Sequence, residues 1–97
     1  MNLTFGDALK LMKKGRKASR LGWRGRGMFA YYVPAAKYPA SRNRTGVMIE
    51  HADSDGLVSY NAYMAIKNVD GTVSTWVPSV GDCLSEDWFE VMHESDS

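Results

Sequence analysis

The chain has 97 residues, of which 44% are hydrophobic and 24% charged, and its formal net charge is +1. This length leaves room for one small core, so we expect a single domain of residues 1–92 and a flexible polar tail of residues 93–97. The near-neutral charge excludes a strong field for duplex DNA, the one cysteine excludes an intrachain disulfide, and no apolar run approaches the ~20 residues that span a bilayer. With no secretory signal at the amino terminus, the default expectation is a cytosolic globular protein.

The first predicted element is an amphipathic helix. Thr4 is a suitable N-cap and Asp7 follows three residues later, which approximates a capping box. Gly15, just after Lys14, can adopt the left-handed conformation that closes a helix. The apolar residues at helical spacing are Phe5, Ala8, Leu9 and Met12. We expect this helix to cover a sheet rather than to bind a partner.

A hairpin is predicted next. Residues 17–21 form a short strand, residues 22–27 a glycine-rich bend, and residues 28–33 a second strand. In the second strand Phe29, Tyr31 and Val33 should share one face.

The segment 34–59 is expected to be a long loop, of a kind that is more often functional or mobile than idle. Its acidic cluster from Asp53 to Gly56 resembles a calcium loop only faintly, since Met64 stands where the bidentate glutamate belongs. His51 and His93 have no ligand spacing with Cys83, so no metal site is expected.

A second hairpin is expected from residue 60 onward. Apolar and polar residues alternate along one strand over residues 60–67, Asp70-Gly71 predicts a type I′ turn, and residues 72–77 return.

The C-terminal part contains three short elements. Residues 79–84 suggest a short turn or a single helical turn, residues 85–87 another turn, and residues 88–92 a last strand. The predicted fold class is therefore α+β, with an N-terminal helix packed on an antiparallel sheet and the domain assembled as a homo-oligomer.

The stretch from Lys17 to Pro34 is the main candidate site. It contains three arginines, three glycines and Trp23, and this mixture suits a nucleotide-like anion, because guanidinium groups favour phosphates, glycines allow close approach and an indole can stack on a base. Trp23 contacts either a ligand or the core, whereas Trp76 and Trp88 are expected to be structural. The eleven aromatic residues exceed what one small core readily hides, so some should line a site or an interface.

Catalytic motifs are missing from the sequence. It contains no nucleophile with an evident base, no HExxH motif, no P-loop and no paired carboxylates in a recognisable frame. We therefore expect a binding protein rather than an enzyme, with no cofactor.

Several short motifs, taken in order from Phe5 to Val91, resemble the Thoeris anti-defence protein two family of small phage proteins. They are FGDAL at 5–9, KGRK at 14–17, RLGW at 20–23, GRGM at 25–28, Val33-Pro34, Asp70-Gly71, Trp76 and DCLSEDW at 82–88. The insert between Ala35 and Ser59 matches the family poorly, so no specificity residue is carried over for it.

The resemblance implies a protein of the host cytoplasm that binds an immune signalling nucleotide, a cyclic isomer of ADP-ribose, without degrading it. The implied protein is a sponge that keeps the host effector inactive. The resemblance also implies a homotetramer with ligand pockets between subunits. For some members it implies separate sites for cyclic di- or trinucleotides of another defence system.

By motif, Trp23 would be the stacking residue, Arg20 or Arg26 a phosphate partner, and Asp82 or Asp87 an acceptor for ribose hydroxyls, although Asp87 alternatively caps a turn. The predicted ligand-binding set is Trp23, Arg20, Arg26, Met28, Tyr31, Asp82 and Asp87, with no catalytic and no metal residue.

Two alternatives remain open. One is a hydrolase that destroys the same signal. The other is a single-stranded nucleic acid binder that uses Trp23, Tyr31 and the arginines, whose affinity would fall steeply with salt.

Overall fold

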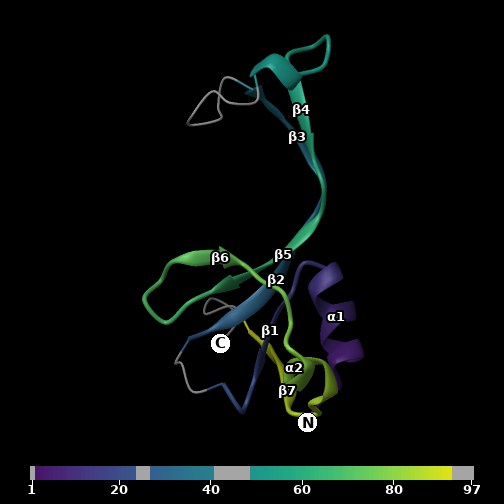
Figure 1. The fold of residues 1–97 in the computed structure, drawn as a ribbon. Helices are drawn as coiled ribbons and strands as arrows, with labels where there is room; N and C mark the ends of the chain where they lie inside the picture. The colour runs from purple at the N-terminus through teal and green to yellow at the C-terminus, as the bar shows by residue number, and fades with distance from the viewer. Residues whose placement is uncertain (1, 24–26, 41–48, 93–97) are drawn as a thin grey trace.

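A computed structural model describes residues 2–23, 27–40 and 49–92 of the chain (Figure 1). In these residues a five-stranded antiparallel sheet has the order β6-β5-β2-β1-β7, and two further strands, β3 and β4, pair separately. The elements are α1 (Phe5–Lys13), β1 (Lys17–Arg20), β2 (Phe29–Val33), β3 (Ala36–Pro39), η2 (Ile49–His51), β4 (Leu57–Tyr60), β5 (Tyr63–Lys67), β6 (Val73–Thr75), α2 (Val80–Leu84) and β7 (Trp88–Val91).

Helix α1 begins and ends as its sequence predicts. The Thr4 hydroxyl accepts from the Asp7 amide at 3.2 Å, and the Asp7 carboxylate accepts from the Thr4 amide at 3.1 Å, which completes the capping box. Gly15 has a φ of +88° and donates from its amide to the Met12 carbonyl at 2.9 Å. The helix prediction is therefore confirmed.

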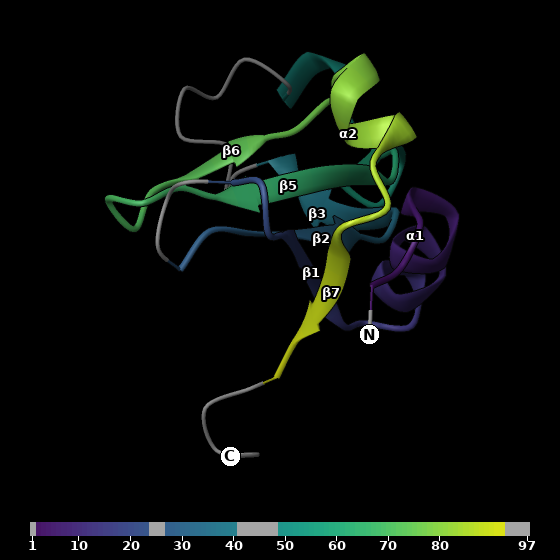
Figure 2. The ribbon, with the colours of Figure 1, turned by 90° about the horizontal axis from the view of Figure 1, so that it is seen from below.

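The core lies between α1 and one face of the five-stranded sheet (Figure 2). Ala8 and Met12 from the helix pack with Ala18, Ala30 and Trp88 from the strands, and all five are fully buried. The alanines let helix and sheet approach closely, and Trp88 fills the remaining volume. The α+β class and the structural role of Trp88 are thus confirmed.

The first predicted hairpin is present, since β1 and β2 are antiparallel neighbours with Ala18 opposite Ala30. Because side chains alternate along a strand, Phe29, Tyr31 and Val33 lie on the face opposite to the one that α1 covers. None of these three side chains is fully buried. This second face, which no described helix covers, carries two of the cavities described below.

The prediction of a long loop over residues 34–59 is wrong. β3 and β4 pair over four residues each and form an arm that projects from the sheet, with η2 near its tip (Figure 1). Pro39 is in β3, an edge strand of a two-stranded sheet, where a missing amide donor is tolerated. The sequence could not reveal this pairing, because each strand is short and its partner lies about twenty residues away.

The predicted single strand over residues 60–67 is also interrupted. β4 ends at Tyr60 and β5 begins at Tyr63, so the two intervening residues carry the chain from the arm into the main sheet. The hairpin of β5 and β6 is confirmed, but its turn type is not. Gly71 has a φ of +89° while no described non-glycine residue has a positive φ, whereas a type I′ turn needs two adjacent positive φ values.

Of the C-terminal predictions, the helical turn and the last strand are confirmed as α2 and β7, whereas residues 85–87 form a bend rather than a turn. Ser79 caps α2 through a second capping box, with the Asp82 amide donating to the Ser79 hydroxyl at 3.1 Å and the Ser79 amide donating to the Asp82 carboxylate at 2.9 Å. β7 then pairs with β1. The predicted tail of residues 93–97 lies outside the described residues. No described helix is long and apolar enough to cross a membrane.

Candidate ligand-binding site

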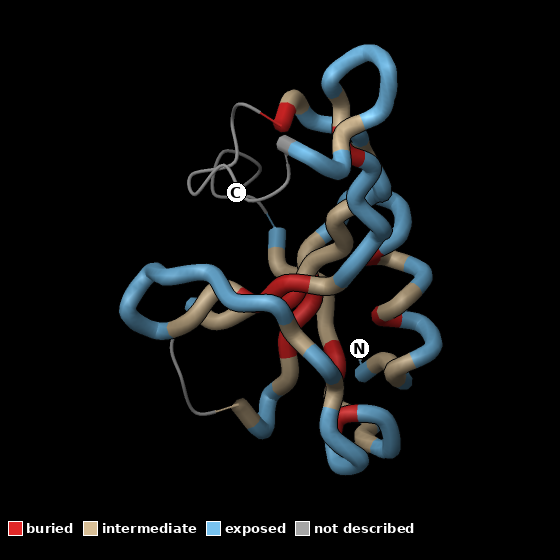
Figure 3. The backbone as a smooth tube through the Cα atoms, turned by 45° about the horizontal axis from the view of Figure 1, so that its top comes forward, coloured by how far each residue is buried: buried red, intermediate tan, exposed pale blue. Residues whose placement is uncertain are grey.

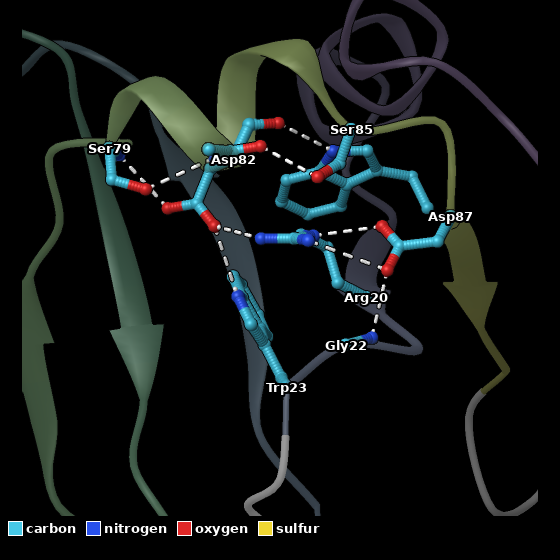
Figure 4. Close-up of polar contacts among 9 residues, drawn as sticks. Arg20, Gly22, Trp23, Ser79, Asp82, Ser85 and Asp87 are labelled. Atoms are coloured by element: carbon cyan, nitrogen blue, oxygen red, sulfur yellow. Dashed lines mark hydrogen bonds and ion pairs between the residues drawn. The ribbon is translucent and has the colours of Figure 1, made fainter.

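A network of charged side chains joins the end of β1 to α2 and to the start of β7 (Figure 4). Arg20 donates from Nε to Asp87 Oδ1 at 2.8 Å and from Nη1 to Asp82 Oδ1 at 2.8 Å. The guanidinium is therefore held between one carboxylate of α2 and one from the segment that joins α2 to β7. Its side chain retains only 18% of its possible exposure.

Asp82 connects the most elements in this network. One of its oxygens accepts from the Ser79 amide and so caps α2, while the other accepts from Arg20 and, at 3.1 Å, from the indole Nε1 of Trp23. The Asp82 backbone carbonyl also accepts from the Trp88 indole at 2.9 Å. One buried aspartate thus orients two tryptophans and one arginine.

Asp87 fixes the start of the glycine bend. Its Oδ2 accepts from the Gly22 amide at 2.8 Å. A Cβ at Gly22 would lie 3.0 Å from this oxygen and 3.1 Å from Arg20 Nη2, so a side chain there would push the ion pair apart. The glycine is needed for close approach rather than for an unusual φ.

The electrostatics of the network follow from these contacts. The hydrogen bonds that Arg20 donates to Asp87 and Asp82 raise the pKa of Arg20. Burial opposes ionisation of Asp82, but hydrogen bonds from Ser79, Arg20 and Trp23 outweigh it and lower the pKa of Asp82. The pKa of Asp87 is lowered, chiefly by its hydrogen bond from Arg20. All three groups are charged at neutral pH, and the network carries one more negative than positive charge.

Trp23 belongs to a cluster of aromatic rings. Its ring centroid lies 5.2 Å from that of Trp88 and 6.0 Å from that of Trp76, both in edge-to-face geometry. Trp23 is only half-buried, so part of its ring remains accessible. It therefore contacts the core and also borders a cavity.

That cavity lies where β1 leads into the glycine bend and has a volume of about 330 Å³. Arg20, Trp23 and Met28 line it together with Phe89 and Val91 of β7. Three residues of the predicted site thus line the same cavity. Residues 24–26, which include the predicted Arg26, lie outside the described residues.

A second cavity of about 410 Å³ lies on the sheet face opposite to α1 and includes the predicted Tyr31. Lys17, Phe29, Lys67 and Val73 also line it. The sequence analysis did not select either lysine, although strand alternation places both on the same face as Phe29 and Tyr31.

A third cavity of about 310 Å³ lies at the base of the arm. Tyr38, Tyr60 and Tyr63 line it, and each is 40 to 47% exposed. The Tyr38 and Tyr60 rings meet edge to face with centroids 5.6 Å apart. The sequence analysis missed this cavity because it depends on the pairing of β3 with β4.

The structure thus brings together four of the predicted residues, Arg20, Trp23, Asp82 and Asp87, as one internally bonded network with Met28 beside it. Tyr31 lies in a different cavity. Among the residues that the structure describes, no three histidine, cysteine or acidic side chains are grouped as a metal site would require.

Fold and site together define a small α+β protein with cavities that are lined by aromatic residues. Beside one of these cavities lies a charged network whose members donate and accept hydrogen bonds among themselves. The family model described as the Thoeris anti-defense 2-like domain (Tad2-like) matches residues 3–91. The protein Thoeris anti-defense 2 of Bacillus phage SP01 is 30% identical over 86 residues, which are 89% of this chain and 91% of the phage protein. The chain therefore belongs to the Thoeris anti-defense 2-like family, and this membership implies a role in phage anti-defence.

Proposed function

We propose that this protein is a phage anti-defence sponge that acts in the host cytoplasm. It binds a cyclic isomer of ADP-ribose, the immune signal, and sequesters it without cleavage, so that the host effector is not activated. The observation that carries the proposal is family membership over residues 3–91.

The site chemistry supports binding without turnover. The carboxylates of Asp82 and Asp87 already accept hydrogen bonds from Arg20, and their lowered pKa values keep them ionised at neutral pH. A general acid needs a pKa near the working pH, which neither group has. Trp23 and Met28 offer apolar walls for a ligand beside this network.

We propose that the protein acts as a homotetramer with ligand pockets shared between subunits. Cavities of about 330 and 410 Å³ lie at the lower end of the range for small-molecule sites, so a second subunit would deepen them. Val80 and Leu84, four residues apart on α2, and Val77, shortly before the helix, are 75 to 83% exposed. An apolar stripe of this kind is suited to an interface between subunits.

We also propose separate sites for cyclic di- or trinucleotides of a second defence system. The cavity at the base of the arm is our candidate, because its three exposed tyrosines offer faces on which bases can stack.

The test is to incubate the purified protein with cyclic ADP-ribose isomers and with cyclic di- and trinucleotides. Unbound material is removed by filtration, the protein is denatured by heat, and the released compound is identified. We expect intact cyclic ADP-ribose in a fixed ratio to subunits, with retention lost in Trp23→Ala. Val69→Ala in the exposed β5–β6 turn is the control and should retain the ligand.

Two results would contradict the proposal. Release of a linear or hydrolysed product would identify the hydrolase. Retention of single-stranded oligonucleotides with a steep loss of affinity at higher salt would identify a nucleic acid binder.

A further inference from the structure

Two lysines converge on one aromatic ring in the cavity opposite to α1. The Nζ atom of Lys17 lies 5.0 Å from the Phe29 ring centroid, and that of Lys67 lies 5.6 Å from it. Lys67 is the cross-strand partner of Phe29, and Lys17 reaches the same ring from β1. Both lysines are partly buried.

This pair of like charges has no carboxylate partner among the described residues, whose ion pairs involve Arg16, Arg20 and Lys37 instead. The lysines come from β1 and β5, the two neighbours of β2, and each ammonium group is attracted to the Phe29 ring of β2. Two ammonium groups therefore line one cavity without a described carboxylate to balance them, and an anion bound in the cavity would supply the opposite charge.

Lys67 is also held in place by the backbone. Its Nζ donates to the Gly27 carbonyl at 3.3 Å, which leaves its other N–H groups for a ligand. Gly27 has a φ of +76°, and a Cβ there would lie 3.4 Å from this nitrogen. The glycine bend thus positions Lys67 at the cavity of about 410 Å³.

Arg20 differs from the lysines in its charge balance. Two carboxylates surround its guanidinium, so the group has no net positive charge to offer. We infer that Lys17 and Lys67 form a subsite for the phosphates of a diphosphate-bearing nucleotide, in the cavity lined by Phe29 and Tyr31. This inference rests on the proposed function and names the charged part of the ligand that this face recognises.

The experiment uses inorganic pyrophosphate and ADP as probes at low ionic strength, with affinity measured by calorimetry. The variants are Lys17→Gln and Lys67→Gln, each compared with Lys37→Gln, which removes a lysine of the arm. We expect each of the first two to weaken pyrophosphate binding about tenfold, since one charged hydrogen bond contributes about that factor. Lys37→Gln should leave the affinity unchanged.

A second readout guards against misfolded variants. In the wild-type protein, pyrophosphate should shift the NMR signals of the Phe29 and Tyr31 rings and of the Gly27 amide. Unchanged affinity in both lysine variants, an equal loss in Lys37→Gln, or no shift of these signals would overturn the inference. Retention of cyclic ADP-ribose is measured separately. Wild-type protein that binds pyrophosphate but retains no cyclic ADP-ribose would therefore contradict the proposed function alone.

Discussion

At the scale of single residues, Arg20 and Asp82 contribute more to the structure than to an open site. Arg20 is the only described cation in contact with either Asp82 or Asp87, and Asp82 connects α2, β1 and Trp23 through its two oxygens. Removing one partner of such a group leaves the other charges without compensation. Two predictions follow from this arrangement.

Replacing Arg20 by methionine should lower the free energy of unfolding by about 3 kcal/mol, the lower end of the range for a broken buried pair. The reason is that Asp82 stays buried without its cation. Urea denaturation measures the change. Lys37→Met is the matched control, because the ion pair of Lys37 with Asp53 is exposed and should contribute less than about 1 kcal/mol. Equal effects of the two substitutions would contradict the prediction.

Acid should destabilise the protein through the same network. The pKa values of Asp82 and Asp87 lie below their usual value of 3.8 in the folded state. A depressed pKa stabilises the fold at pH values above the unfolded pKa, and this stabilisation is lost as the pH falls through the folded pKa. We expect no change from these groups between pH 7 and about 5 and a loss below about pH 4. The same acid dependence in Arg20→Met would exclude the network as its source.

At the scale of elements, the arm is set apart from the rest of the fold (Figure 1), and most of the described buried residues lie outside it (Figure 3). Each of its strands packs mainly on the other, and Val58 and Ala40 are its only described buried residues. The radius of gyration is 16.1 Å, whereas a compact chain of this length would have about 12–13 Å. An isolated two-stranded ribbon is marginally stable in water, so the arm depends on its anchorage in the main sheet or on a partner.

The main sheet should fold without the arm. Val33, the last residue of β2, pairs with Tyr63, the first residue of β5, so an Asn-Gly turn in place of residues 34–62 would join these strands directly. We expect the shortened protein to unfold cooperatively on heating, with near-ultraviolet circular dichroism from the tryptophan cluster retained. Loss of the cooperative transition would show that the arm supports the core.

At the scale of the whole molecule, the exposed apolar stripe of α2 is the clearest candidate for contact between subunits. Val80 and Leu84 of α2, together with Val77 shortly before it, are each exposed to 75% or more, although α2 itself is well capped and packed near α1. Three exposed apolar side chains close together on a small protein favour association between subunits, because an interface removes them from water.

The double substitution Val80→Glu and Leu84→Glu should shift the assembly toward smaller species. Desolvating two carboxylates at an interface opposes association. Sedimentation velocity measures the distribution of species. Val69→Glu is the control, since Val69 is 61% exposed in the β5–β6 turn and should leave the distribution unchanged. A wild-type protein that is monomeric at all concentrations would contradict the homotetramer.

Local sequence determined the elements whose signals lie within a few residues. The capping residues Thr4 and Ser79 set the starts of both helices, Gly15 closed the first, and apolar alternation marked the β1–β2 and β5–β6 hairpins, because caps and pleats depend on near neighbours. The family motifs likewise selected four residues that lie together in space.

Only the tertiary structure decided how those residues are used. It paired β3 with β4 across a long separation, balanced Arg20 with two carboxylates more than sixty residues away in the chain, and brought Lys17 and Lys67 to one ring. The reason is physical: a charge becomes a ligand contact or a structural bond according to which groups reach it, and those groups come from distant segments that the fold places side by side.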